Sequence, residues 1–372
     1  MRIAVDARPL EQERTGVGRY LEGLLGAWLN LFPADDFVLL SPRPVLLPPP
    51  LEGRVTVRTR LSRLPGTVWL QAAAAHEARS EGCEIFFGSL GIVPIRSPLP
   101  SVATVHDLTP LLFPEWHSLK NRLGFAPFIG PTVEVARRIA CVSESTRRDL
   151  VARFPAAEGK SRVVPNGFLP PAPPGDGAGE AGATGATGAT GVSAPYVLFL
   201  GTREPRKNLL RLVEAMESIW DRRPAFPLLL VAGASGWNLP AFEQGLAASR
   251  HAGKVQLLGW VSPERSTALL RGARLLAYPS LYEGFGLPPL EAMALGTPVV
   301  ASSSSSLPEV VGDAGLLPDP RDVAAIASAI ERTNDDEPFR AEAIRKGRER
   351  AARFTWEGAA RATRILFEES LP

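Results

Sequence analysis

Two glutamates, Glu283 and Glu291, are separated by seven residues in the segment PSLYEGFGLPPLEAMALG (279–296). Glycines and a Pro-Pro pair fill the interval, so one regular helix is not expected to carry both carboxylates. An ionised carboxylate only accepts hydrogen bonds, which suits two neighbouring sugar hydroxyls. The spacing fits a sugar at each end of a diphosphate, one of them ribose. The alternative is a strand-loop-helix junction whose glutamates are merely solvated.

A strand, a loop and a helix are expected to position these carboxylates. The apolar run ARLLAYPS (273–280) predicts a strand, and Glu283 follows it in a glycine-rich loop. The Pro-Pro pair then opens a helix that ends at Gly296, which places Glu291 in the first helical turn. Unpaired N–H groups at the start of a helix bind anions, so we expect a phosphate there.

A second segment, GTREPRKN (201–208), follows another predicted strand and also opens a helix. Arg206 and Lys207, helped by Arg203, lie where a diphosphate needs neutralising. A basic turn that only caps a helix is the alternative. One domain thus has two segments that could bind phosphate, each at the end of a strand. This combination favours a binding site over a basic turn that only caps a helix.

Short apolar runs alternate with helical patterns along both halves of the chain, which predicts parallel sheets covered by helices. We therefore predict an α/β protein with two doubly wound, Rossmann-like domains facing a central cleft, where ligands bind beyond the carboxyl ends of the strands. Strands are expected at 2–7, 37–40, 54–58, 84–88, 101–107, 138–143, 162–167, 196–201, 227–233, 254–259, 273–280, 297–302 and 314–319.

The domain boundary is expected at residues 169–195, which contain almost nothing that can enter a core. Their proline, glycine, alanine and threonine content predicts a flexible linker between an N-terminal domain, 1–168, and a C-terminal domain, 196–355.

Composition narrows the function classes. A chain of 372 residues predicts about two domains, and a net charge of +2 argues against a nucleic-acid partner. Cys83 and Cys141 lie far apart in apolar surroundings, as expected for reduced core residues of a cytoplasmic protein. We expect neither a signal peptide nor a membrane-spanning segment.

The motifs taken together resemble the retaining glycosyltransferases of family 4, the group 1 glycosyltransferases with the GT-B fold. The resemblance rests on the two glutamates, their flanks from 259 to 302, and motifs that match in order. These motifs are TGVGRY (15–20), TVHDLTPLLFPEWHS (104–118), VSESTRRDL (142–150), VPNG (164–167), SLPEVVGDAGLLPDPRD (306–322) and FTWEGAARAT (354–363). The resemblance also implies that a helix in residues 356–372 crosses back to the N-terminal domain.

The resemblance implies a role for each matching residue. Glu283 would bind hydroxyls of the donor sugar, Glu291 those of the ribose, and His106 would face the donor sugar. Arg206 and Lys207 would neutralise the departing diphosphate, with Arg203 competing for the arginine role. The implied catalytic residues are His106, Arg206, Lys207 and Glu283, and the implied donor-binding residues are Gly16, Gly18, Arg203, Gly284, Phe285, Gly286, Leu287 and Glu291. Gly16 and Gly18 are expected in the loop after the first strand, where they would let the backbone approach the diphosphate or the acceptor.

The resemblance further implies transfer of a hexose from a nucleotide diphosphate sugar to an acceptor hydroxyl. Mannosyl- and rhamnosyltransferases of bacterial surface-polysaccharide synthesis are the most similar members, so GDP-mannose is the favoured donor and a UDP-hexose the second choice. No Asp-x-Asp motif stands near a predicted strand end, so we expect no metal and no cofactor. The acceptor is expected to be a saccharide or a lipid-linked saccharide.

Two other functions, and two interpretations of one segment, stay open at this point. A dinucleotide-dependent oxidoreductase would need a third glycine closer to Gly16 and Gly18 than Gly23 is. A non-catalytic nucleotide-sugar binder would need no intact set of site residues. The mixed apolar and basic stretch 116–138 can rest peripherally on the inner face of a membrane or form a buried helix with a solvated edge.

Overall fold

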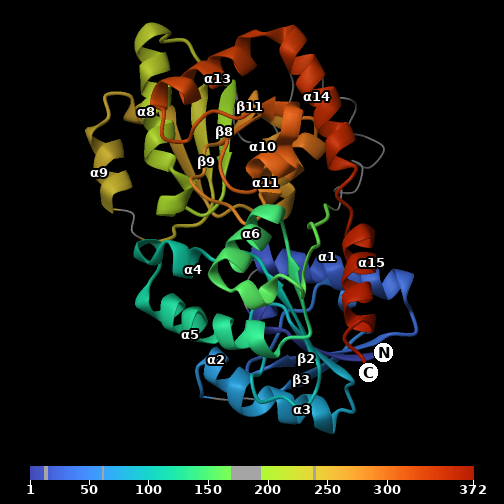
Figure 1. Ribbon diagram of the computed structural model, residues 1–372. Helices are drawn as coiled ribbons and strands as arrows, with labels where there is room; N and C mark the ends of the chain where they lie inside the picture. The colour runs from blue at the N-terminus through green and yellow to red at the C-terminus, as the bar shows by residue number, and fades with distance from the viewer. Residues whose placement is uncertain (12–15, 61–62, 169–193, 238–239) are drawn as a thin grey trace. The chain divides into compact units, whose positions relative to one another are not determined.

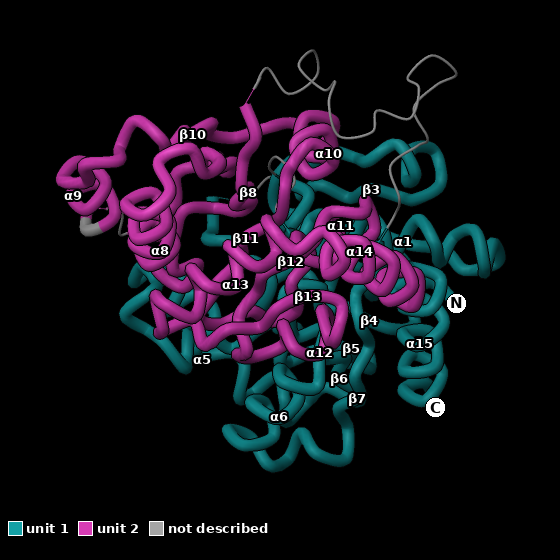
Figure 2. The backbone as a smooth tube through the Cα atoms, turned by 90° about the horizontal axis from the view of Figure 1, so that it is seen from above, with its two compact units in different colours: residues 1–169, 354–372 teal, residues 170–353 magenta. Residues whose placement is uncertain are grey.

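The computed structural model describes residues 1–11, 16–60, 63–168, 194–237 and 240–372 (Figure 1). The chain forms two compact units, drawn in two colours in Figure 2. Unit 1 contains residues 1–169 and 354–372, and unit 2 contains residues 170–353. The expected linker lies outside the described residues except for positions 194 and 195.

A seven-stranded parallel sheet forms the centre of unit 1, in the order β3-β2-β1-β4-β5-β6-β7. Strand β1 pairs with β2 through Val5 and Leu39 and with the middle strand β4 through Val5 and Phe87. The strands are β1 (Arg2–Asp6), β2 (Asp36–Ser41), β3 (Thr56–Thr59), β4 (Ile85–Gly88), β5 (Ser101–Val105), β6 (Arg138–Cys141) and β7 (Ser161–Val163).

Apolar side chains cover both faces of this sheet. Successive residues of each strand point to opposite faces, so each strand contributes to both. On β1, Ile3 and Val5 belong to one apolar cluster and Ala4 to another, and Phe86 and Phe87 divide in the same way on β4. The covering helices are α1 (Gly16–Leu31), α2 (Gly66–Trp69), α3 (Ala75–Ser80), α4 (Thr109–Leu112), α5 (Leu119–Val135) and α6 (Glu144–Arg153). A short π-helix, Leu70–Ala74, joins α2 to α3.

Unit 2 repeats this plan with a six-stranded parallel sheet in the order β10-β9-β8-β11-β12-β13. The order in which strands are added to the sheet therefore reverses between β8 and β11, as it does between β1 and β4 in unit 1. The strands are β8 (Tyr196–Leu200), β9 (Leu228–Ala232), β10 (Val255–Gly259), β11 (Leu275–Tyr278), β12 (Val299–Ala301) and β13 (Gly315–Leu316).

The helices of unit 2 pack as two sets, α8 against α9 and α13, and α11 against α10, α12 and α14 (Figure 1). Their bounds are α8 (Leu209–Arg222), α9 (Pro240–Ala248), α10 (Pro263–Gly272), α11 (Leu287–Ala294), α12 (Leu307–Val311), α13 (Val323–Asp335) and α14 (Glu337–Ala351). The predicted α/β class with two Rossmann-like domains is thus confirmed.

The last helix, α15 (Trp356–Glu368), belongs to unit 1 although it follows unit 2 in sequence (Figure 2). It packs along α1, where Trp356 is 4% exposed and Phe367 is fully buried. Gly23 of α1 accommodates the indole, because a Cβ atom at this position would lie 2.2 Å from Trp356. Gly23 therefore serves the packing of α1 against α15.

Two local predictions from the sequence are wrong. Gly16 and Gly18 were expected in the loop after the first strand, but both lie in the first turn of α1, which begins at Gly16. Glu291 was expected in the first turn of its helix, but α11 begins at Leu287 and Glu291 is its fifth residue. Among the described residues, no helix has the length and apolar character needed to cross a bilayer.

We predict that α15 contributes strongly to the stability of unit 1. Trp356→Ala should lower the free energy of unfolding by about 3–5 kcal/mol, because it removes a large buried aromatic side chain. Ile365→Ala is the matched control on the same helix, since Ile365 is 52% exposed, and it should cost less than about 1 kcal/mol. Urea titration, with hydrogen exchange of the α1 amides to report on unit 1 alone, measures both effects. Equal losses in the two variants would contradict the prediction.

Candidate active site

The site in unit 2 is built on β8 and β11, which are neighbours at the centre of the sheet. In doubly wound sheets, ligands bind beyond the carboxyl ends of the strands, where the strand order reverses. Segment 201–208 leaves the end of β8, and segment 279–286 leaves the end of β11. The two segments predicted from the sequence to bind a nucleotide sugar therefore start from adjacent strands.

Hydrogen bonds to backbone carbonyls join these two segments. The backbone N–H of Leu281 donates to the carbonyl of Arg206 at 2.7 Å. The side-chain amide of Asn208 donates to the carbonyl of Pro279 at 3.0 Å, and Arg206 donates to the carbonyl of Tyr282 at 3.2 Å. Asn208 has a left-handed backbone (φ 60°) and is the N-cap residue of α8. These bonds fix the basic segment, 201–208, against the glutamate segment, 279–286.

Four charged side chains form an ion-pair cluster on this frame. Lys207 Nζ lies 2.6 Å from Oε1 of Glu283, and Arg206 lies 2.7 Å from Oε2 of the same carboxylate. Arg206 also pairs with Glu204 at 2.7 Å. Lys207 donates a further hydrogen bond to the hydroxyl of Tyr278 at the end of β11. We call Glu204, Arg206, Lys207 and Glu283 the ion-pair cluster.

Glu204, Lys207 and Glu283 are buried and Arg206 is partly exposed, and the opposite charges of the cluster stabilise one another. Burial alone would raise the pKa of Glu283, but the neighbouring charges of Arg206 and Lys207 outweigh it and lower the pKa to about 2. Burial and the charge of Arg206 lower the pKa of Lys207 from its usual value. Burial, followed by the charge of Glu283, raises the pKa of Tyr278 well above its usual value. Glu283 is therefore an anion, and Tyr278 a neutral hydroxyl, at physiological pH.

A run of serines after β12 holds the glutamate loop from its other side. The hydroxyl of Ser305 accepts a hydrogen bond from the backbone N–H of Glu283 at 2.8 Å. The buried hydroxyl of Ser306 lies 2.9 Å from the carbonyl of Glu283 and 2.7 Å from that of Phe285. Ser305 has a positive φ of 52°, which an L-residue adopts only where its surroundings enforce it. These serines therefore define the backbone path of the loop.

Helix α11 supplies fewer backbone donors than the sequence suggested. Pro288 and Pro289 are its second and third residues and have no N–H, so the donors at its start are those of Gly286 and Leu287. Gly286 has a φ of 111°, and a Cβ atom there would lie 2.7 Å from Leu307. The start of α11 therefore offers an anion fewer N–H donors than a helix start usually does.

The remaining predicted residues of unit 2 have distinct positions. Arg203 bonds to the hydroxyl of Ser235 and forms a β-bridge with it, so Arg206, rather than Arg203, is the arginine that contacts Glu283. Glu291 is 4% exposed on α11. Gly284 and Phe285 lie buried in the loop that carries Glu283.

His106, a predicted residue of unit 1, lies where β5 ends, beside the end of β4. His106 follows β5, and its Nε2 lies 2.9 Å from the carbonyl of Ser89, which follows β4. Its ring meets the ring of Tyr20 edge-on, with centroids 4.7 Å apart. Burial lowers the pKa of His106, so the imidazole is neutral at neutral pH. Arg8 pairs with the buried Asp6 at 2.6 Å where β1 ends.

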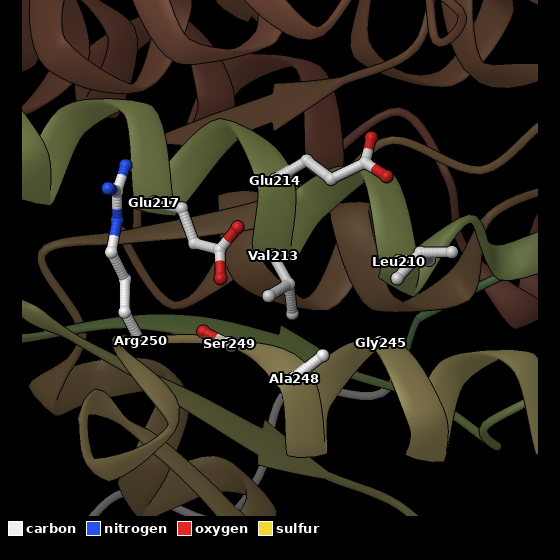
Figure 3. Close-up of a pocket in the computed structure, with 8 residues that line it drawn as sticks. All are labelled: Leu210, Val213, Glu214, Glu217, Gly245, Ala248, Ser249 and Arg250. Carbon is white, nitrogen blue, oxygen red and sulfur yellow. The ribbon is translucent and has the colours of Figure 1, made fainter.

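A separate groove of about 390 Å³ lies between α8 and α9 (Figure 3). In this view Glu217 points into the gap between the helices and Glu214 points away from α9. Among the described residues that line the groove, none is a predicted site residue. The lining consists of Leu210, Val213, Glu214, Glu217, Gly245, Ala248, Ser249 and Arg250.

Comparison with known proteins identifies the family. Residues 189–350 match the model of the group 1 glycosyl transferases, and residues 15–168 match that of glycosyltransferase family 4. The chain is 35% identical over 273 residues to the O-antigen chain mannosyltransferase B of Escherichia coli, a match that covers 71% of this chain and 68% of that protein. The chain belongs to glycosyltransferase family 4.

Solved structures show the same fold. Sucrose-phosphate synthase from Thermosynechococcus elongatus superposes with a TM-score of 0.77 at 22% identity, covering 99% of this glycosyltransferase and 98% of that chain. The Anabaena protein HepE, solved with UDP and glucose, superposes with a TM-score of 0.73 at 19% identity, covering 99% of each chain. Both expectations, a glycosyltransferase of family 4 and the GT-B fold, are confirmed.

Sequence reasoning missed several residues that shape the site of this glycosyltransferase. Glu204 and Asn208 stand inside the basic segment, and Tyr278 ends the strand before Glu283. Ser305 and Ser306 belong to a run of five serines after β12. The available signal was composition: a glutamate between basic residues, and serines where a loop must turn, are both unusual unless they bind neighbouring groups.

We predict that Ser306 is required to hold the glutamate loop. Ser306→Ala should lower the free energy of unfolding of unit 2 by about 1–3 kcal/mol, because buried carbonyls would lose their donor. Ser303→Ala is the matched control, since Ser303 is exposed in the same serine run. Hydrogen exchange of the amides of 281–287 checks the local effect. Unchanged protection of these amides in Ser306→Ala would show that the hydroxyl does not hold the loop.

Proposed function

We propose that this glycosyltransferase transfers mannose from GDP-mannose to a hydroxyl of a saccharide or lipid-linked acceptor, with retention at the anomeric carbon. We infer a role in the synthesis of a surface polysaccharide or glycolipid. The observation that carries the proposal is the buried ion-pair cluster at the point where the strand order of unit 2 reverses. Similarity to an O-antigen chain mannosyltransferase supports mannose as the sugar.

Each part of the donor has a proposed partner. Glu283 accepts hydrogen bonds from hydroxyls of the mannose, helped by the backbone from Gly284 to Leu287. Glu291 accepts from the ribose hydroxyls, and Arg206 and Lys207 neutralise the diphosphate. From unit 1, His106 bonds to a hydroxyl of the donor sugar. Gly16 and Gly18 allow the backbone at the start of α1 to approach the diphosphate or the acceptor, and Arg203 supplies secondary positive charge.

The proposed chemistry involves no covalent intermediate on the protein. Retention by double displacement needs a carboxylate nucleophile beside the anomeric carbon, and Glu283 and Glu291 are both assigned to hydroxyl binding instead. The acceptor oxygen attacks the anomeric carbon on the face from which the diphosphate leaves. The bond from that carbon to the phosphate oxygen breaks, and the departing phosphate takes the acceptor proton. Arg206 and Lys207 stabilise the charge that develops on the diphosphate, without a metal ion.

We propose that the enzyme is cytoplasmic and binds peripherally to the inner face of a membrane, where its acceptor is located. The first turns of α5 support this idea. Leu119 and Leu123 are 65% and 60% exposed, and the exposed Lys120 and Arg122 lie between them in sequence. Exposed leucines mixed with basic residues suit an anionic lipid surface. The second half of α5 is buried around Ile129 and Val133, as a helix of the protein core is.

The donor preference is the prediction that tests this function. GDP-mannose should raise the melting temperature more than UDP-glucose does, and mannose should pass to a mannose-containing oligosaccharide with retained configuration. UDP-glucose is the second candidate, because a structure of the same fold, HepE, was solved with UDP and glucose. Thermal shifts and product analysis by NMR measure both properties. A panel in which no nucleotide sugar stabilises or reacts would contradict the proposed function.

The same assay includes a chelator arm. Transfer should persist in EDTA, since the protein's own cations neutralise the diphosphate, whereas Arg206→Ala combined with Lys207→Ala should abolish transfer. Loss of transfer in EDTA that Mg²⁺ or Mn²⁺ restores would show that a metal ion, and not the pair Arg206 and Lys207, neutralises the diphosphate.

A further inference from the structure

Arg206 lies between two carboxylates, and only one of them was expected. One guanidinium nitrogen lies 2.7 Å from Glu283, the predicted sugar ligand, and another lies 2.7 Å from Glu204. Glu204 is 7% exposed, so its carboxylate has been removed from water. Burying a charge is unfavourable unless it is well paired, and the pair with Arg206 supplies that compensation. A buried carboxylate beside a proposed diphosphate site nevertheless opposes the binding of an anion.

The charges of the ion-pair cluster cancel. Arg206 and Lys207 contribute two positive charges, and Glu204 and Glu283 contribute two negative ones. Lys207, Glu204 and Glu283 are each less than 10% exposed, so solvent screens these charges weakly. Before a donor binds, the net charge of the cluster is therefore zero, and it attracts a diphosphate only weakly. To bind, it must compete with the two carboxylates for the same guanidinium and ammonium groups.

We propose that Glu204 is a positioning residue that holds Arg206 and keeps the cluster neutral. A free nucleoside diphosphate then binds weakly, and Glu204 contributes to selectivity for the complete nucleotide sugar. The inference rests on the proposed function, because it takes the ligand to be a nucleotide diphosphate sugar. A complete donor differs from the free diphosphate in having sugar hydroxyls. These hydroxyls donate to Glu283 and replace the hydrogen bonds that Arg206 and Lys207 make to it. The two cations then become available to the phosphates.

Sugar binding and diphosphate binding are coupled in this scheme through one shared carboxylate. The donor gains both sets of contacts, whereas the product nucleoside diphosphate gains one set and must still displace Glu283. After transfer, Glu283 pairs again with Arg206 and Lys207, which favours release of the nucleoside diphosphate. Glu204 sets how strongly the empty cluster resists an anion, because it holds Arg206 through a different guanidinium nitrogen from the one that contacts Glu283.

The variant Glu204→Gln tests this role. It keeps the size of the side chain and a weaker hydrogen bond to Arg206, but it removes one negative charge. Free GDP should bind about tenfold more tightly than to the wild type, because the cluster becomes positive. The preference for GDP-mannose over GDP should fall by a similar factor. Isothermal titration with GDP and with GDP-mannose measures both affinities, and melting temperature checks the fold.

The control is Glu214→Gln, which removes one negative charge from an exposed position on α8 (Figure 3) and should leave both affinities unchanged. A purely structural role for Glu204 predicts the opposite sign, namely weaker GDP binding and a lower melting temperature. Either that result or an unchanged GDP affinity in Glu204→Gln would overturn the inference. A wild-type enzyme that prefers UDP-glucose is tested in the same way with UDP and UDP-glucose. Failure of every nucleotide sugar on the wild type refutes the proposed function instead.

Discussion

The site depends on one buried carboxylate that pairs with two cations. Glu283 lies between Arg206 and Lys207, at 2.7 and 2.6 Å, and it is 6% exposed. A buried ion pair is stable only if its geometry is good and its remaining lone pairs are satisfied. The structure meets both conditions by fixing the backbone on each side of Glu283. Hydrogen bonds from the basic segment hold one side, and the serines after β12 hold the other.

This arrangement follows from the topology of a parallel sheet. Residues that follow β8 and β11 are more than seventy positions apart in sequence, yet the two strands are neighbours where the strand order reverses. Unit 1 has the same order around β1 and β4, and its polar residues gather at the corresponding ends: Asp6 with Arg8, Ser89, and His106. Helix α15 completes the core of unit 1 by burying Trp356 and Phe367 against α1 and the sheet.

Local patterns predicted most of the fold. Each predicted strand overlaps an observed one, because short apolar runs between turn residues are a strong signal in buried parallel sheets. Helix starts were less predictable: Gly16 and Gly18 lie in α1 although glycine favours loops, and Glu291 is the fifth residue of α11. The segments of the site could be predicted from their charges, but the pairing within them could not. Whether Arg203 or Arg206 reaches Glu283 depends on the path of two loops, and no spacing in the sequence reports that path.

The affinity of the variant Glu283→Gln for free nucleoside diphosphate tests the central claim most directly. The amide keeps the shape of the side chain but no longer neutralises Arg206 and Lys207, so both cations become available to phosphate. We predict that GDP binds this variant at least about tenfold more tightly than the wild type in isothermal titration. Weaker or unchanged GDP binding in a folded Glu283→Gln protein would contradict the account, because it would mean that Glu283 does not compete with the diphosphate for these cations.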